Sequence, residues 1–160
     1  MREDNTFWPL LLDLASCLGR EITDSALPEP CFVGILPGAN VALDYCQECG
    51  DKCGMAWVRL TSIRPSGASA ELSNPCGGPL EASIEVGISR CAPMGSEGEP
   101  PTMAEQLESA QLMMADQSAA LRAIRCCMGR ERDFDLGAWT PMGPMGGCVG
   151  GTWTVIYQQV

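Results

Sequence analysis

The chain has 160 residues, enough for one domain with a substantial apolar core. Twenty acidic residues against ten basic ones give a formal net charge of −10, which argues against tight nucleic-acid binding through phosphate contacts. The absence of histidine, the commonest general base, argues against an enzyme. No apolar stretch approaches the length of a membrane span, and Glu3, Asp4 and Asp13 argue against a signal peptide. We therefore expect folding in a reducing cytoplasm and no membrane association.

The N-terminal part predicts an arm followed by a short helix. Residues 1–8 are interpreted as a loose arm, and residues 9–160 as a single α+β domain. Pro9 suits the first turn of a helix that ends near Gly19. Five apolar side chains share one face of this helix: Leu10, Leu11, Leu14, Cys17 and Leu18.

Three strands are predicted next. A short apolar strand at 31–36 ends in a Pro-Gly turn, and a cysteine-containing connector at 39–54 leads to a strand at 55–63. The loop at 64–79 is longer than most connections in compact domains, which favours a functional or partner-bound role. Residues 80–91 give the clearest strand signal. Its apolar side chains share one face: Ala82, Ile84, Val86 and Ile88.

The longest predicted element is a helix at 102–127, roughly 40 Å long at about 1.5 Å per residue. Thr102 and Glu105 form a capping box at its start, and Gly129 predicts its end. Two seven-residue tracks make an apolar stripe broken only by a glutamine: Met103, Ala110, Gln117, Ile124, Leu107, Met114, Leu121 and Met128. We expect this stripe to pack on the sheet. A sharper hypothesis is that an alanine-rich flank also meets a neighbouring subunit: Ala115, Ala119 and Ala123.

The C-terminal part predicts a hairpin. Its strands are residues 134–140 and 152–158, and residues 141–151 form a long glycine-rich tip. If Trp139 and Trp153 lie opposite each other, they form a cross-strand aromatic pair. The resulting order, α-β-β-β-α-β-β, predicts a small, mainly antiparallel or mixed sheet packed by one long helix and a short N-terminal helix.

Ten cysteines are many for a reducing compartment. Without a secretory signal a disulfide framework is the weaker interpretation, and most are interpreted as small buried apolar residues. Cys46, Cys49 and Cys53 are close enough in sequence to bind zinc together, with Cys76 as a fourth ligand. A disulfide is the alternative for this cluster, and plain thiols lining a loop are the preferred state.

No catalytic or cofactor-binding residue is predicted. The Cys-x-x-Cys at Cys46 is not followed by a helix pattern, which argues against a thioredoxin-like redox function. The glycine block 146–151 lacks a Gly-Lys-Ser/Thr ending and precedes a strand, so it does not predict a phosphate-binding loop. Asp133 and Asp135 are interpreted as a solvated strand face, because no other catalytic group converges on them.

Five blocks carry a resemblance to a known family. They are LPEPCFVG (27–34), DYC (44–46), CGMAWVRL (53–60), EVGISRCAP (85–93) and WTPMGPMGGCVGGTWTV (139–155). Together they resemble the tail terminator of long-tailed phages of actinobacteria, from about residue 10 to the C-terminus. The glycine-rich part of the last block is the most specific.

The resemblance implies a structural virion protein of the phage tail and neck, assembled in the host cytoplasm. Six copies would form a homohexameric ring that caps the tube of the major tail tube protein, ends its polymerisation and joins the tail to the head-tail connector or stopper. DNA would pass through the lumen without specific binding, because acidic residues facing a channel do not hold phosphates. One alternative is another neck protein, such as a stopper or adaptor. Another is a zinc-binding interaction module built on the cysteine cluster.

Overall fold

The computed structural model describes residues 7–38, 41, 48–66, 78–96, 98–129 and 133–158. It is an α+β domain with two helices, a five-stranded mixed sheet and a small two-stranded hairpin, and the order of the main elements is the predicted one. In chain order they are α1 (Trp8–Asp24), β1 (Phe32–Ile35), β2 (Glu48–Cys49), β3 (Lys52–Cys53), β4 (Met55–Pro65), β5 (Leu80–Cys91), α2 (Met103–Met128), β6 (Phe134–Met145) and β7 (Cys148–Gln158).

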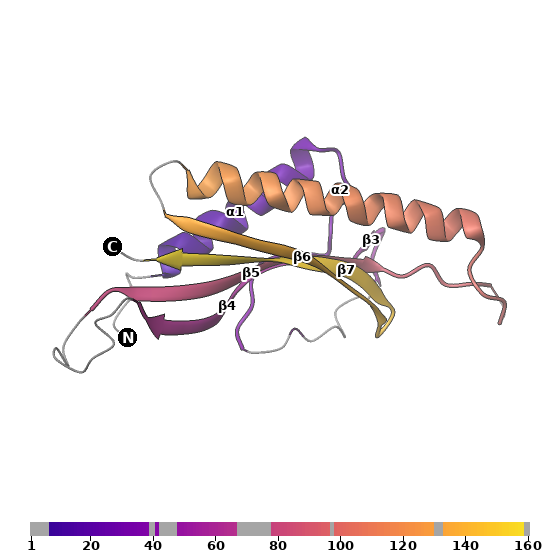
Figure 1. The fold of residues 1–160 in the computed structure, drawn as a ribbon. Helices are drawn as coiled ribbons and strands as arrows, with labels where there is room; N and C mark the ends of the chain where they lie inside the picture. Colours follow the sequence, from indigo (N-terminus) through magenta and orange to yellow (C-terminus); the bar gives the residue numbers. More distant parts are fainter. Residues whose placement is uncertain are drawn as a thin grey trace.

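The main sheet has the strand order β1-β4-β5-β7-β6. The short β1 runs parallel to β4, whereas the other neighbouring strands are antiparallel. Both helices cover the same face of this sheet, so the domain has two layers (Figure 1). The predicted N-terminal arm and the loop at 64–79 lie largely outside the described residues, as does half of the 39–54 connector. The described end of the arm is not loose, because Phe7 is buried in the core and Trp8 begins α1.

The apolar core lies between the helices and the inner face of the sheet. Strand side chains alternate as predicted, and those that face the helices are fully buried: Ala56, Val58, Ala82, Ile84, Val86, Ile88 and Val155. The predicted apolar face of α1 is buried against them: Leu10, Leu11, Leu14, Cys17 and Leu18. Fully burying one aliphatic side chain stabilises a fold by about 1.5–3 kcal/mol, so these alternating positions determine which face of each strand turns inward.

The first helix is longer than predicted. Its expected end near Gly19 is wrong, because α1 continues to Asp24 and buries Ile22, one turn beyond Leu18, to 1% exposure. A Cβ atom built on Gly19 would lie 3.5 Å from Cγ1 of Val33, an ordinary contact. Glycine here sits where α1 passes close to β1 and does not end the helix.

The long helix starts and ends where the sequence predicts, within one residue. The side chain of Thr102 accepts a hydrogen bond from the backbone N–H of Glu105, whose own side chain accepts one from the backbone N–H of Thr102, which completes the capping box. Gly129 follows the last turn with a φ of +66°, a conformation that favours glycine.

The predicted stripe packs on the sheet only towards the C-terminal end of α2, and the rest of the packed face is a different one. Ile124 and Met128 of the predicted stripe are buried, and so are four side chains outside it: Asp116, Ala119, Ala120 and Ala123. At 3.6 residues per turn, Asp116, Ala119 and Ala123 lie roughly opposite the predicted stripe. Small side chains let the helix approach the sheet closely, and the N-terminal members of the stripe, Met103, Leu107 and Met114, stay exposed. Because Ala119 and Ala123 are fully buried within their own chain, they do not face a neighbouring subunit, which corrects that hypothesis.

The last hairpin has a tight tip instead of a long one. β6 and β7 extend to Met145 and Cys148, and only Gly146 and Gly147, both with positive φ, form the turn. Other glycines of this block lie within β7, where space is short: a Cβ atom at Gly151 would lie 2.4 Å from the ring of Trp139. That ring packs against Trp153 with centroids 5.9 Å apart and ring planes tilted by 56°, so the predicted cross-strand pair is confirmed.

Candidate functional site

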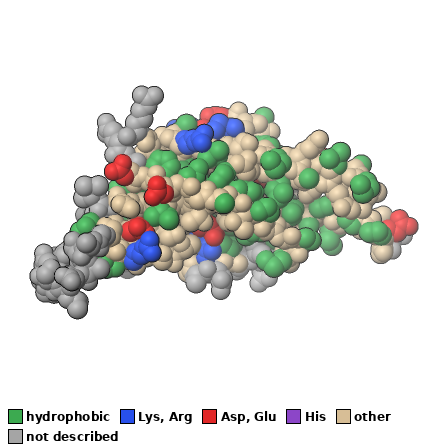
Figure 2. All heavy atoms as spheres, in the orientation of Figure 1, with side chains coloured by type: hydrophobic (Ala, Val, Ile, Leu, Met, Phe, Trp, Pro, Cys, Tyr) green, Lys and Arg blue, Asp and Glu red, His purple; other side chains and the backbone are tan. Residues whose placement is uncertain are grey.

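The N-terminal half of α2 carries an unusually exposed apolar stripe. In Figure 1 these turns project beyond the end of the sheet. Met103, Leu107 and Met114 are 82%, 61% and 59% exposed, although they lie on the two tracks that end in the buried Ile124 and Met128. We call these three residues the exposed stripe. Figure 2 shows hydrophobic side chains gathered over this end of the molecule.

A shallow apolar hollow adjoins the exposed stripe. Its volume is about 300 Å³, and it lies where α2, the linker before it and the tip of the β6–β7 hairpin meet. Apolar side chains dominate its lining: Ala92, Pro93, Pro101, Gln106, Ser109, Ala110, Met113, Pro144 and Val149. Met94 and Met145, next in sequence to two of these prolines, are 80% and 57% exposed. Stripe and hollow together form an apolar area of the kind that marks a protein contact surface.

A buried ion pair fixes α2 to the rest of the domain. Arg90, at the end of β5, donates from Nε to Oδ2 of Asp116 at 2.9 Å and from Nη2 to Oδ1 at 2.7 Å. The same guanidinium also donates to the backbone oxygen of Pro28. Arg90 and Asp116 are only 6% and 1% exposed, and Asp116 lies where the packed half of α2 begins. The pair therefore fixes the position from which the N-terminal half of α2 projects beyond the sheet. Nothing in the sequence pattern distinguished Asp116 from a surface acid.

A second polar network lies on the opposite side of the sheet. Oε1 of Glu85 accepts from Trp57 Nε1 at 2.9 Å and from Arg59 Nε at 2.7 Å, and Oε2 accepts from Arg59 Nη2 at 2.9 Å. Burial alone raises the pKa of Glu85, but the hydrogen bonds from Arg59 and Trp57 and the charge of Arg59 outweigh it, so the pKa is held below its usual value. Arg59 also donates to the backbone oxygen of Gly38, which ties the segment after β1 to β4. On this face of β4 and β5, the polar groups of Trp57, Arg59 and Glu85 thus have hydrogen-bond partners within the fold.

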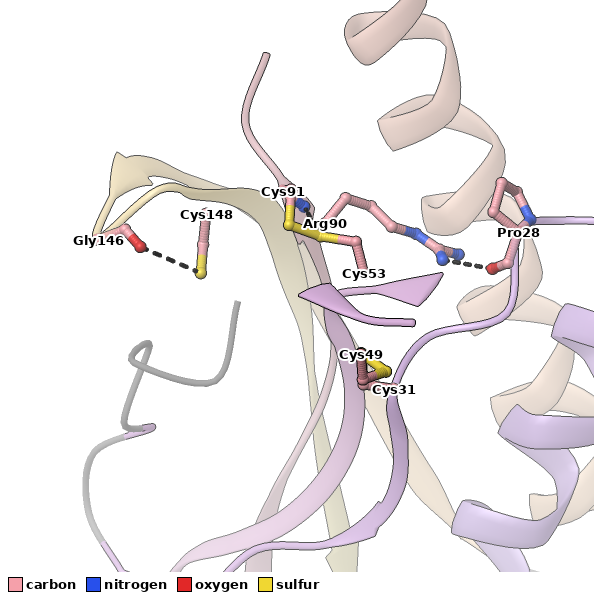
Figure 3. Close-up of a disulfide and its surroundings, with 8 residues drawn as sticks. All are labelled: Pro28, Cys31, Cys49, Cys53, Arg90, Cys91, Gly146 and Cys148. Atoms are coloured by element: carbon pink, nitrogen blue, oxygen red, sulfur yellow. Dashed lines mark hydrogen bonds between the residues drawn. A yellow bond between two sulfur atoms is a disulfide. The ribbon is translucent and has the colours of Figure 1, made fainter. Parts of the chain in front are cut away.

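The predicted zinc ligands have other partners where they are described. Cys49 forms a disulfide with Cys31, and Cys53 forms one with Cys91 (Figure 3). Among the described residues, no group of three or more metal-ligating side chains converges. Cys46 and Cys76 lie outside the described residues, so the four-cysteine zinc site stays a prediction.

The expectation of mostly free thiols is wrong for the described cysteines. In addition to the two disulfides above, Cys17 of α1 is bonded to Cys127 of α2, and Cys148 is also disulfide-bonded. Within the described segments the one free cysteine is Cys126, which is exposed. The lack of a signal-peptide pattern says nothing of which cysteines meet in the fold, and Cys17 and Cys127 lie side by side although they are 110 positions apart in the chain.

The aspartates beside β6 line a separate small hollow. Asp133 and Asp135 border a space of about 230 Å³ together with Phe134, Ile156 and Gln158. Both aspartates are exposed, in keeping with the solvated strand face expected from the sequence.

The sequence matches no protein-family model, and no curated protein is significantly similar to it. Neither described helix is both long enough and apolar enough to cross a membrane.

Proposed function

We propose that this chain is a structural protein that assembles with copies of itself into a ring, as the tail terminator of a long-tailed phage does. The observation that carries the proposal is the exposed stripe with its adjoining hollow. In a single chain, Met103, Leu107 and Met114 are exposed to water because this half of α2 extends past the end of the sheet. Contact with another protein would remove that apolar area from solvent.

The location of the resembling sequence blocks supports the same proposal. The blocks at 53–60, 85–93 and 139–155 fall largely on β4, β5 and the β6–β7 hairpin, which are neighbours in the sheet. The last two blocks also supply Pro93, Pro144 and Val149 to the hollow. The segments that resemble a tail terminator thus form the centre of the sheet and one wall of the candidate contact surface.

A ring of identical subunits needs two different, complementary surfaces on each copy. In the proposed arrangement the exposed stripe and hollow of one copy form one of them, and the neighbouring copy supplies the other. The mechanism is geometric: one face of the closed ring matches the last layer of the tail tube, the other face presents no tube-like surface, and polymerisation stops there. The head-tail connector then binds that second face. A net charge of −10 suits a ring through which DNA passes without being held.

Tube capping tests this function directly. Purified tail tube protein from the same phage is polymerised with and without this chain, and tube length is measured by electron microscopy. We expect short, capped tubes with the wild-type chain and with Ala104→Glu, which adds a charge at an exposed position beside the stripe. We expect long, uncapped tubes with Leu107→Glu, which places a charge in the stripe. Uncapped tubes with the wild-type chain would contradict the proposal. Equal capping by both variants would remove the stripe from it.

A further inference from the structure

The β2–β3 hairpin is the least self-supporting part of the described fold. Its two strands contain two residues each, and an isolated pair of such short strands is not stable in water. Cys49, Gly50, Asp51 and Lys52 are exposed, and Cys53 is half-buried. The hairpin therefore contributes no described side chain to the apolar core.

Two disulfides tie this hairpin to the domain. Cys31–Cys49 joins it to the segment before β1, and Cys53–Cys91 joins it to the end of β5, each with a Cα–Cα distance of 5.8 Å (Figure 3). Besides the disulfides, the backbone N–H of Cys91 donates to Sγ of Cys53 at 2.9 Å, and an ion pair joins the hairpin to Glu29. Lys52 Nζ lies 2.6 Å from Glu29 Oε2, but this pair is exposed on both sides, and such pairs add little stability.

The hairpin forms part of the wall of a hollow of about 450 Å³. Its Asp51, Lys52 and Cys53 line this hollow, and Leu112 of α2 lines it too. The adjacent Arg90–Asp116 pair joins β5 to α2 without involving the hairpin. The core positions of β5 are fully buried by other elements. The hairpin and the body of the domain are thus held by different interactions.

We propose that the β2–β3 hairpin is a redox-controlled flap. With Cys31–Cys49 and Cys53–Cys91 formed, the hairpin is fixed beside α2. Reduction by a dithiol releases it and removes part of the wall of the hollow, while the main sheet and both helices stay folded. Each disulfide takes two electrons and two protons from the dithiol, yields two cysteine thiols, and leaves the dithiol as its own disulfide. The proposal does not rest on the ring function.

The sequence offers a specific probe of this motion. Lys52 is the only lysine in the chain, so a lysine-specific endoprotease cuts once, between residues 52 and 53. A protease needs several residues around its target bond in an open, extended form, and its rate follows the population of that form when opening and closing are fast. Removing a disulfide raises that population by at least roughly tenfold, because the constraint on the open state is lost.

We therefore expect the full-length chain to be cut at least tenfold faster in dithiothreitol than in non-reducing buffer. Hydrogen exchange followed by mass spectrometry should meanwhile show unchanged protection in β5 and β7. Equal cleavage rates in the two buffers would overturn the proposal. So would loss of exchange protection in β5 and β7 together with the hairpin, because the domain would then be unfolding as a whole.

Paired serine variants assign the effect to the correct disulfides. In non-reducing buffer, Cys53→Ser with Cys91→Ser should accelerate cleavage, whereas the matched control, Cys17→Ser with Cys127→Ser, should not. The control removes a disulfide that joins α1 to α2 and leaves the hairpin attached. Equal acceleration by both pairs would overturn the proposal. Where a variant does not fold, the comparison of the oxidised and reduced wild-type chain decides the outcome alone.

Discussion

Replacing Asp116 by alanine should be among the most destabilising single changes in the domain. The carboxylate is 1% exposed and accepts two hydrogen bonds from Arg90, at 2.9 and 2.7 Å. Its loss removes both of these hydrogen bonds, and the carboxylate charge, from a guanidinium that is 6% exposed. Removing one member of a buried ion pair costs about 3–5 kcal/mol, which for a domain of this size corresponds to a fall in Tm of about 6–20 °C.

Urea unfolding under non-reducing conditions, followed by tryptophan fluorescence, measures this loss. Trp57 is fully buried and reports on the core. The control is Arg122→Ala, which breaks an exposed pair with Glu21 at 3.0 Å and should change the free energy of unfolding by no more than about 1 kcal/mol. A loss from Asp116→Ala as small as that of the control would refute the assignment of Arg90–Asp116 as the anchor of α2.

A double replacement separates the two parts of the effect. Arg90→Leu together with Asp116→Leu removes both charges and fills the space with apolar atoms. Buried pairs replaced in this way often lose little or no stability, so the double variant should be more stable than either single charge-removing variant. A double variant as unstable as Asp116→Ala would indicate that packing, and not the unpaired charge, dominates the loss.

Three further predictions follow from other contacts. Because the pKa of Glu85 is lowered in the folded state, its contribution to stability is fully present above its ordinary pKa and is lost as the pH falls through the folded value. The difference in free energy of unfolding between the wild-type chain and Glu85→Gln, measured by urea unfolding from pH 7 to pH 3, should therefore shrink as the pH falls. Gly151→Ala should destabilise the domain by about 1–3 kcal/mol, because its Cβ would overlap the ring of Trp139, whereas Gly78→Ala, with open space around it, should have almost no effect on the thermal midpoint. Thr102→Ala should cost about 1 kcal/mol by removing the N-cap of α2, seen as faster amide exchange in the first turn of that helix.

The strands were predictable because their signal is local. In β5, four apolar residues alternate with polar ones, and all four are fully buried where the pattern places them: Ala82, Ile84, Val86 and Ile88. The capping box of α2 needs only Thr102 and Glu105, three positions apart, so its start could also be predicted from the sequence. Such features depend on a few neighbouring residues and do not need knowledge of the rest of the fold.

The orientation of α2 could not be predicted in the same way. The large apolar residues give a stronger periodic signal for the buried face than the alanines do. In the structure, however, Ala119 and Ala123 pack inward and Leu107 faces water. A short distance between the helix and the sheet favours small side chains between them. That distance depends on how the two layers pack and cannot be derived from the helix sequence alone. The Arg90–Asp116 pair and the Cys17–Cys127 disulfide were missed for a related reason, since their partners are far apart in the chain.

The glycine-rich block shows how composition misleads about loops. Glycines usually indicate turns, and Gly146 and Gly147 do form one. Gly150 and Gly151 instead lie in β7. Glycine is needed at these two positions because a Cβ atom there would meet the backbone of β5 or the ring of Trp139. Only the register of the strands distinguishes these two uses of glycine.

The central claim, that the chain forms a ring through the exposed stripe, is tested most directly by its mass in solution. Multi-angle light scattering behind a sizing column, in non-reducing buffer, is measured for the wild-type chain alone and with tail tube protein, and for Leu107→Glu and Ala104→Glu under the same conditions. We predict a closed oligomer of the wild-type chain, alone or with the tube protein, that is lost in Leu107→Glu and kept in Ala104→Glu. A wild-type chain that stays monomeric both alone and with the tube protein would contradict it.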